Sequence, residues 1–353
     1  MNIVYNAFNG RYADSPRAIH QGLLARGDDH QHVWLQNGGF AETFPPGVAT
    51  VPIGTPAAVA ALESADVLVN NTHVQLDRWH KRPGVTYLQT WHGTPLKRIH
   101  RSAVSLPEES LMAELDADIA RWDFLISQSS AASALLRSAF GSPGRMLETG
   151  YPRNDVLSAP DADERRRKLR AQLEVADDMT AVLYAPTYRD DEVDDHRLNG
   201  LDPEELLRRL GPGHMILLRQ HYFLHERPAL THLPGLVDVS RYPEIADLYL
   251  AADVLVTDYS SAMFDFAVTG KPILLFLYDL LHYRERLRGF VLDLATEAPG
   301  PMLLDQGQLT EALRDLPAAT AESATRYAAF RERYCALEDG HATDRVLDRV
   351  FGG

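Results

Sequence analysis

The sequence predicts an α/β protein built from two parallel-sheet domains, and three observations lead to that prediction. Short apolar runs, many of them β-branched, alternate with segments of helical period along the chain. Most runs end in a polar or glycine-rich turn, as buried parallel strands do. The length of 353 residues corresponds to about two domains at roughly 150 residues each. Because strands and helices alternate in both halves, we expect one parallel sheet in each.

The first half begins with a strand, a helix and a second strand. The helix is expected over residues 15–27, where Ser15 can cap it, Pro16 suits its first position and Gly27 can close it. Its apolar residues recur at the spacing of one buried helix face. The predicted strands of this half are residues 3–5, 32–35, 67–70, 85–89 and 124–127.

The boundary between the domains is expected within residues 151–178, where a Pro- and Asp-rich segment precedes a charged helix at 164–175. We therefore assign residues 1–175 to an N-terminal domain and residues 176–353 to a C-terminal domain. The basic run in that helix is interpreted as a solvated face, because acidic residues flank it; a membrane or a phosphate polymer is the alternative partner.

The second half repeats the alternation of the first. Helical patterns cover residues 203–210, 243–251 and 261–268. The predicted strands of this half are residues 182–184, 215–218, 237–239, 254–257 and 273–276.

Composition and charge exclude several classes of protein. With 45% hydrophobic and 24% charged residues, the chain is neither disordered nor fibrous. Lys and Arg number 35 against 49 Asp and Glu, a net charge of −14, which disfavours general nucleic-acid binding but permits a local basic pocket. The single cysteine, Cys335, excludes a disulfide framework within the chain. Without a signal peptide or a run of about 20 apolar residues, we expect a cytoplasmic location, with peripheral contact at the inner membrane face left open.

The first segment with chemical potential is QTWHGTPLK at residues 89–97, directly after a predicted strand. Ligands of open parallel sheets bind at the carboxyl ends of the strands. His92 lies in a tight turn there and can take a proton from a hydroxyl group near neutral pH. Gly93 allows close approach of a substrate, and Lys97 can offset phosphate charge. A structural role for a loop histidine is the alternative.

The second segment is TDYSSAMFDF at residues 257–266. Small hydroxyl residues followed by a helical pattern describe a helix N-terminus, whose unpaired N–H groups and dipole attract anions. Ser260 and Ser261 can cap this helix and donate hydrogen bonds to a diphosphate. Capping alone is the alternative interpretation, because serine is a preferred cap.

The third segment is LLRQH at residues 217–221. Arg219 and His221 are two residues apart and share one side of a continued strand. A cation beside an imidazole suits phosphoryl stabilisation. His221 and His225 also have the i,i+4 spacing of a metal pair, but without an HExxH motif or a Cys/His cluster we expect no metal site.

The common phosphate and hydrolase signatures do not occur in the sequence. It contains neither a GxxxxGK[ST] loop nor a GxGxxG turn that opens a strand–helix unit. A nucleoside triphosphatase or a dinucleotide oxidoreductase is therefore disfavoured. The absence of GxSxG likewise disfavours an α/β-hydrolase.

Taken in order, TWHGTPLKRI, LYAPTYRD and TDYSSAMFDFAVTGKPILLFLYDL resemble the motifs of the CDP-glycerol glycerophosphotransferases, the teichoic-acid primases and polymerases. The opening segment GRYADSPRAI and the later DGHA at residues 339–342 are similar to further segments of that family. The resemblance extends over essentially the whole chain. One departure is Tyr222, which follows His221 where the family usually has proline.

The resemblance implies a GT-B-type fold, in which two Rossmann-like domains face each other across a cleft. The N-terminal domain would be the acceptor side and the C-terminal domain would bind the donor, CDP-glycerol or CDP-ribitol. The phosphopolyol would pass to a hydroxyl of a polyol phosphate, glycan or lipid-linked acceptor, and CMP would leave. Such a displacement at phosphorus needs an alcohol held in line and charge neutralised on the leaving group.

The family motifs also imply roles for individual residues. His92 would be the general base, His221 a second catalytic or phosphate-stabilising histidine, and Thr94 and Lys97 contacts to acceptor or phosphate. No cofactor is implied, and we expect independence of metal, with helix N-termini, His and Arg neutralising charge. The implied donor-binding residues are Arg189, Arg219, Asp258, Ser260, Ser261, Asp339 and Gly340.

Two other functions fit parts of this pattern. A nucleotide-sugar glycosyltransferase of the same architecture would share the diphosphate-binding helix end but would transfer to a sugar carbon. A non-catalytic module that recognises a phosphopolyol polymer would retain the fold without the chemistry. Concerning docking, the net charge of −14 argues against strong electrostatic attachment to anionic lipid.

Overall fold

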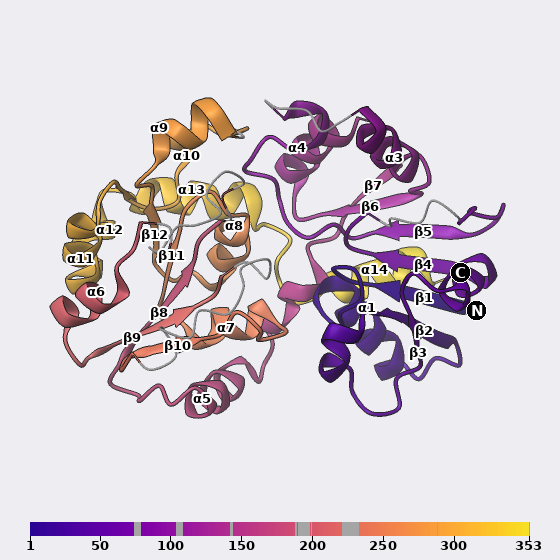
Figure 1. Cartoon of the computed structure of the whole chain (residues 1–353), viewed down its shortest axis with the longest axis horizontal. Helices are drawn as coiled ribbons and strands as arrows, with labels where there is room; N and C mark the ends of the chain where they lie inside the picture. Colours follow the sequence, from indigo (N-terminus) through magenta and orange to yellow (C-terminus); the bar gives the residue numbers. More distant parts are fainter. Residues whose placement is uncertain are drawn as a thin grey trace.

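The computed structural model contains two parallel sheets, one in each half of the chain, as predicted (Figure 1). It describes residues 1–73, 79–103, 109–141, 144–187, 189, 198, 200–220, 233–287 and 289–352. Helices flank both sheets in the alternation expected from the sequence.

The N-terminal sheet has seven strands in the order β3-β2-β1-β4-β5-β6-β7. Every pairing in it is parallel, and Asn70 at the end of β4 lies beside Gln89 at the end of β5. All five strands predicted in this half are confirmed, whereas the short edge strands β3 and β7 were not predicted. The strands are β1 Asn2–Asn6, β2 Gln31–Gln36, β3 Thr50–Pro52, β4 Val67–Asn70, β5 Thr86–Gln89, β6 Phe124–Ser127 and β7 Arg145–Glu148.

The C-terminal sheet has six strands in the order β10-β9-β8-β11-β12-β13, again all parallel. The five predicted strands are confirmed, and the two-residue edge strand β13 is the addition. The strands are β8 Thr180–Ala185, β9 His214–Leu218, β10 Leu236–Asp238, β11 Val254–Thr257, β12 Ile273–Phe276 and β13 Met302–Leu303.

The helices follow the predicted pattern, with one correction at the first. Helix α1 begins at Asp14, with Ala13 before it and no side-chain cap, so the prediction that Ser15 caps this helix is wrong. Pro16 is accordingly the third helical residue instead of the first. The α-helices are α1 Asp14–Ala25, α2 Pro56–Ser64, α3 Glu109–Ile119, α4 Ser130–Phe140, α5 Ala162–Gln172, α6 Pro203–Leu210, α7 Ile245–Ala251, α8 Ala262–Phe266, α9 Leu280–His282, α10 Leu294–Glu297, α11 Gln306–Arg314, α12 Leu316–Ala321, α13 Ala324–Tyr334 and α14 Ala342–Val350.

Short helical turns complete the connections between these elements. They include η3, which joins the two halves of the chain and contacts α1, α7 and α14. The turns are η1 Gly38–Thr43, η2 His100–Ser102, η3 Pro152–Leu157, η5 Ala267–Thr269 and η6 Tyr283–Leu287.

Both faces of each sheet are buried, which explains the nearly continuous apolar character of the central strands. In β1, Val4 belongs to the core on one face of the sheet, whereas Ile3 and Tyr5 belong to the core on the other. In the C-terminal sheet, Leu255 and Val256 of β11 divide between two cores in the same way.

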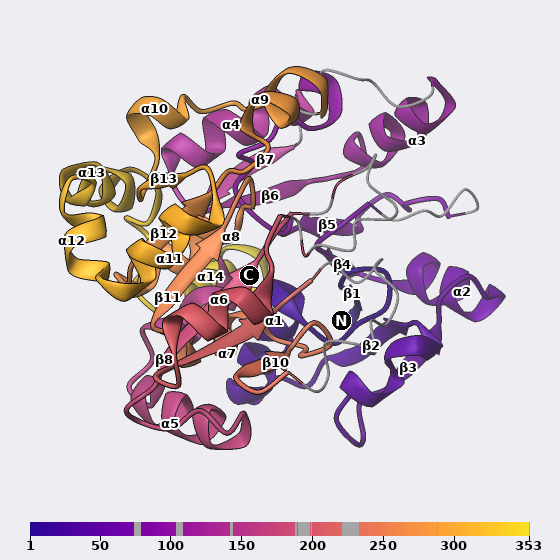
Figure 2. The same ribbon diagram turned by 60° about the vertical axis from the view of Figure 1, so that its left-hand side comes forward.

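Helix α14 and a short antiparallel contact are among the connections between the halves of the chain. Helix α14 returns from the C-terminal half and lies against α1, as Figures 1 and 2 show, so that Val346 and Leu347 join the N-terminal core. The first sheet lies within residues 1–175 and the second within 176–353. Because α14 crosses back, the limits of the two folding units stay a prediction.

The other connection is a short antiparallel contact between the loop after β5 and the segment at Phe290. Lys97 and Phe290 form a β-bridge, and the Val291 N–H donates to the Leu96 carbonyl at 2.9 Å. The loop that follows β5 is therefore attached to the C-terminal half as well as to its own sheet.

Candidate active site between the two sheets

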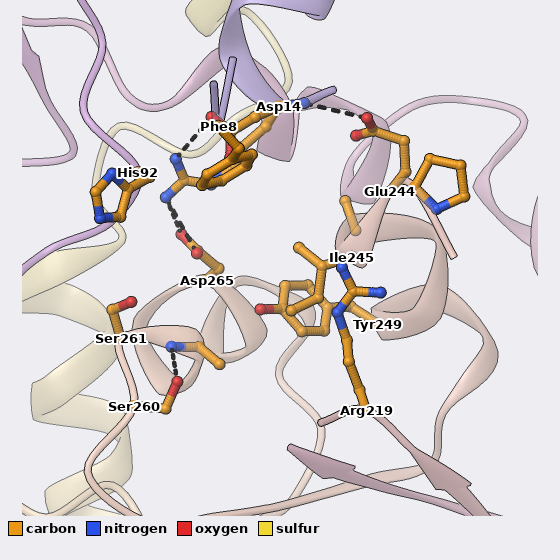
Figure 3. Close-up of a pocket in the computed structure, with 14 residues that line it drawn as sticks. Phe8, Asp14, His92, Arg219, Glu244, Ile245, Tyr249, Ser260, Ser261 and Asp265 are labelled. Atoms are coloured by element: carbon orange, nitrogen blue, oxygen red, sulfur yellow. Dashed lines mark hydrogen bonds and ion pairs between the residues drawn. The ribbon is translucent and has the colours of Figure 1, made fainter. Parts of the chain in front are cut away.

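A pocket between the sheets collects side chains that follow four strands of the fold (Figure 3). Phe8 follows β1, His92 follows β5, Arg219 follows β9 and Ser261 follows β11. All four lie at carboxyl ends of parallel strands, where the sequence predicts ligand binding. The remaining lining residues are Asp14, Arg153, Pro243, Glu244, Ile245, Ala246, Tyr249, Ser260, Ala262 and Asp265.

The His92 imidazole has the protonation pattern of a general base. Its Nδ1 lies 2.7 Å from the Asn71 carbonyl oxygen, which can only accept a hydrogen bond, so Nδ1 carries the proton and Nε2 carries the lone pair. Burial lowers the pKa of His92 to about 4. The ring is consequently neutral at pH 7, with Nε2 free to take a proton.

The backbone around His92 is unusual on both sides. Trp91 has φ of +50° and Gly93 has φ of +152°, a region that favours glycine. A Cβ on Gly93 would lie 2.6 Å from the Ser261 hydroxyl, so glycine is required here for space as well as conformation. This close approach places the histidine loop directly against the serine loop of the other domain.

The two serines have different surroundings. The Ser260 hydroxyl accepts a hydrogen bond from the Ala262 N–H at 3.2 Å and so caps α8. Ser261 precedes the helix without making a side-chain cap, so the prediction that it caps α8 is wrong. Among the described residues its hydroxyl has no hydrogen-bond partner, and it faces the pocket together with His92 (Figure 3).

Arg219 is a cation whose partners are backbone carbonyls. Its Nη1 donates to the carbonyls of Val239 at 3.2 Å and Tyr242 at 2.7 Å. No carboxylate of the described residues forms a salt bridge with it, and burial lowers the pKa of its guanidinium. The remaining N–H groups are thus suited to an anionic ligand.

A second arginine in the pocket, Arg153, is already neutralised. Its Nη2 lies 3.0 and 3.1 Å from the two carboxylate oxygens of Asp265, and its Nη1 lies 3.4 Å from Asp14. Asn154 also donates to Asp265 at 3.0 Å. Since Asp14 belongs to α1 and Asp265 to α8, this buried network joins the two domains in the wall of the pocket.

Glu244 makes a further contact between the domains. Its Oε1 accepts from the Asp14 N–H at 3.1 Å and lies 3.1 Å from Arg17 Nη1. Burial raises the pKa of this carboxyl to about 7. The group is therefore near its titration midpoint at neutral pH.

The pocket also contains four charged residues that the sequence does not predict as site residues: Asp14, Arg153, Glu244 and Asp265. They lie in the opening motif, the linker, the helix at 243–251 and the segment at 257–266. No local pattern marks these charges, because their partners are distant in sequence.

Arg189 and Asp258 do not belong to the lining of this pocket. Arg189 Nη2 is 2.9 Å from Asp258 and its Nε is 2.7 Å from Asp279. Although burial acts in the opposite direction, these carboxylates raise the pKa of Arg189. The guanidinium also lies over the Tyr259 and Tyr283 rings, at 5.1 and 4.8 Å.

The other predicted site residues are distributed around the cleft. Asp339 and Gly340 line a separate groove, which shares Asp14 and Arg153 with the His92 pocket. Thr94 is fully buried, and its hydroxyl contacts Gln128 at 2.9 Å and Tyr151 at 3.2 Å. The substrate contacts expected of these residues and of Lys97 stay predictions. His221 lies outside the described residues.

The described part of the chain contains neither a metal-binding cluster nor a helix that could span a membrane. No group of three or more His, Cys, Asp or Glu side chains there is arranged to hold a metal ion. Nor does any helix in those ranges combine the length and apolar character needed to cross a membrane.

Comparison with known proteins identifies close relatives over the whole chain. Residues 1–352 match the model of the family described as CDP-glycerol:poly(glycerophosphate) glycerophosphotransferase. A teichoic acid glycerol-phosphate transferase of Staphylococcus aureus is 36% identical over 99% of this chain and 93% of its own. A teichoic acid poly(glycerol phosphate) polymerase of Bacillus subtilis is 32% identical over 99% of this chain, which spans 48% of that protein.

Solved structures agree with these sequence relatives. A variant of the wall teichoic acid polymerase TagF soaked with CDPG superposes with a TM-score of 0.90 at 32% identity, covering 99% of this chain and 88% of that one. A UDP-GlcNAc 2-epimerase of Neisseria meningitidis shares the fold alone, with a TM-score of 0.61 at 13% identity over 99% of each chain. The predicted GT-B-type pair of Rossmann-like domains is confirmed.

Proposed function

Because the chain belongs to the CDP-glycerol:poly(glycerophosphate) glycerophosphotransferase family, we propose that the His92 pocket is where it transfers glycerol phosphate. The chain is a CDP-glycerol glycerophosphotransferase of teichoic acid synthesis. The observation that carries this assignment of the pocket is a neutral His92 in one pocket with Arg219, which has no carboxylate partner among the described residues, and with the Ser261 hydroxyl.

His92 acts as the general base on the acceptor. Its Nε2 takes the proton from an acceptor hydroxyl as the oxygen forms a bond to the β-phosphorus of CDP-glycerol. The bond between that phosphorus and the bridging oxygen breaks, and the electron pair leaves with CMP. The hydrogen bond from Nδ1 to the Asn71 carbonyl, at 2.7 Å, supports this assignment because it fixes the tautomer and the ring.

Arg219 and Ser261 hold the donor diphosphate, and Ser260 lines the pocket beside them. Arg219 supplies N–H groups that the described chain leaves unpaired, and Ser261 supplies a free hydroxyl. Arg153 contributes little net charge, because Asp14 and Asp265 already balance it. Charge on the departing CMP is therefore stabilised from the Arg219 side of the pocket.

The relatives favour glycerol over ribitol and a polymeric acceptor. Four relatives named for glycerol phosphate transfer or polymerisation are 32–36% identical over 99% of this chain. The ribitol-phosphate polymerases are 27–28% identical over about 60% of it. We therefore assign CDP-glycerol as the donor and poly(glycerol phosphate) as the acceptor. A cytoplasmic location and contact with the inner membrane face stay predictions, which cell fractionation tests.

The deciding experiment is the His92→Ala variant, assayed for CMP release from CDP-glycerol with a poly(glycerol phosphate) acceptor. Loss of a general base lowers kcat by about 10²–10⁴-fold, whereas calorimetric binding of CDP-glycerol should be retained. CDP-ribitol and UDP-glucose serve as donor controls. Unchanged turnover in the variant would refute the base role, and preference for UDP-glucose would favour a glycosyltransferase.

A further inference from the structure

We propose that Trp91, held in place by the His73–Asp118 pair, is a positioning residue for the His92 imidazole. The inference rests on the base role of His92 proposed above and extends it to three residues that do not line the pocket. A continuous set of contacts runs from the buried Asp118 carboxylate, through His73 and Trp91, to the His92 ring.

The loops that carry His73 and His92 follow neighbouring strands. Asn70 and Gln89, the last residues of β4 and β5, are paired in the sheet. The Thr90 N–H donates to the Asn70 carbonyl at 2.7 Å, and the Gln89 side chain donates to the Thr72 carbonyl at 2.9 Å. With the Asn71 carbonyl bound to His92, the loop after β4 supports the loop after β5 at three successive residues.

Trp91 turns the chain so that His92 enters the pocket. Its φ of +50° is unfavourable for a bulky L-residue and persists only where surrounding contacts fix it. Those contacts include the bond from its N–H to the Gln89 side chain at 2.9 Å. Its ring stacks on His92, with centroids 4.2 Å apart and planes 29° apart, and meets the Phe140 ring at 4.7 Å.

His73 packs against Trp91 and is itself fixed by Asp118. The His73 and Trp91 ring centroids are 5.4 Å apart in an edge contact. His73 Nδ1 donates to the Asp118 carboxylate at 3.1 Å, which also accepts from Trp122 Nε1 at 3.1 Å and from the Tyr87 hydroxyl at 3.3 Å. Three donors on one buried carboxylate leave His73 little freedom to rotate.

A simple packing role is the competing explanation, and the chain offers a matched control for it. His32 also pairs with a carboxylate, Asp28, at 3.0 Å, and also stacks within an aromatic cluster, against Tyr5 at 5.8 Å. His32 lies near the start of β2. The amino ends of the strands are opposite to the carboxyl ends that form the pocket. A His32→Gln variant therefore removes an equivalent His–Asp pair without touching the His92 loop.

The experiment compares His73→Gln with His32→Gln in kcat, in donor affinity and in the ¹⁵N signals of the His92 ring. For His73→Gln we expect kcat to fall roughly 10- to 100-fold, as a misplaced base does. Binding of CDP-glycerol should be unchanged, and the Nδ1–H tautomer of His92 should lose population. His32→Gln should leave all three quantities unchanged. As a test of rescue, Trp91→Phe, which retains a ring, should keep more activity than Trp91→Ala.

Equal kcat and equal His92 signals in the two histidine variants would overturn the proposal. If the Trp91 variants do not fold, His73→Gln and Asp118→Asn decide the question. Failure of the proposed base role can be told apart from failure of the positioning role, because only the former predicts unchanged turnover in His92→Ala. The His92 ring signals report positioning whether or not that histidine is the base.

Discussion

Two arginines follow the neighbouring strands β8 and β9 of the C-terminal sheet, yet their surroundings assign them opposite tasks. Arg189 is 2% exposed and pairs with Asp258 and Asp279. Among the described residues, Arg219 donates to backbone carbonyls and to no carboxylate, and it lines the pocket. A buried guanidinium with two carboxylates is already satisfied. A guanidinium that lacks a carboxylate partner can still bind an anionic group of the substrate. The availability of an arginine for binding therefore depends on its partners.

The largest expected effect comes from removing the satisfied arginine. Arg189→Met leaves two buried carboxylates without their cation, so the free energy of unfolding should fall by about 3–5 kcal/mol. Urea denaturation measures the loss, and donor affinity in the folded protein should change little. A variant that is fully stable but no longer binds CDP-glycerol would reverse the contrast and restore Arg189 to the donor site.

The pocket that Arg219 lines also contains a buried carboxyl group, that of Glu244. Burial raises the pKa of its carboxyl from 4.5 to about 7, so the native state holds this proton more tightly than the unfolded chain does. The stabilisation is complete below pH 4.5 and is lost as the pH rises through 7. At about 1.4 kcal/mol per pKa unit, the loss amounts to roughly 3 kcal/mol.

Glu244→Gln imitates the protonated carboxyl and should therefore lack this part of the alkaline loss. Unfolding free energies at about pH 5 and pH 8 in both proteins give the difference. Glu338, whose pKa burial raises to about 8, is present in both and cancels. Identical pH dependence in the two proteins would show that Glu244 does not titrate in this range.

Local sequence was sufficient to predict the central strands of both sheets. Buried parallel strands are apolar on both faces, so they can be recognised as short apolar runs. It missed β3, β7 and β13, which have two to four residues and lie at sheet edges. For the pocket, position after a strand identified His92, Arg219 and Ser261. Arg189 came from the family resemblance instead, and no local pattern shows that it is paired, because Asp258 and Asp279 are 69 and 90 residues away in the sequence.

Arg219, which has no carboxylate partner among the described residues, should affect donor binding more than folding. Arg219→Gln removes hydrogen bonds to a charged diphosphate, so the affinity for CDP-glycerol should weaken by up to about 3 kcal/mol. Calorimetric titration measures the change. Arg209→Gln, at an exposed position of α6, is the control for loss of one positive charge. An equal, small loss in both variants would mean that Arg219 contributes only general electrostatic attraction.

The smallest effect is expected at the two serines, and it separates them. Ser261→Ala removes a hydroxyl that faces the pocket but keeps the Cβ that lies against Gly93, so the His92 loop stays in place. Donor affinity should fall by about 1.5 kcal/mol while stability is retained. Ser260→Ala removes the cap on the Ala262 N–H and should cost about 1 kcal/mol of stability. If donor affinity is unchanged in Ser261→Ala, the diphosphate does not contact that hydroxyl, and Arg219 holds the donor without it.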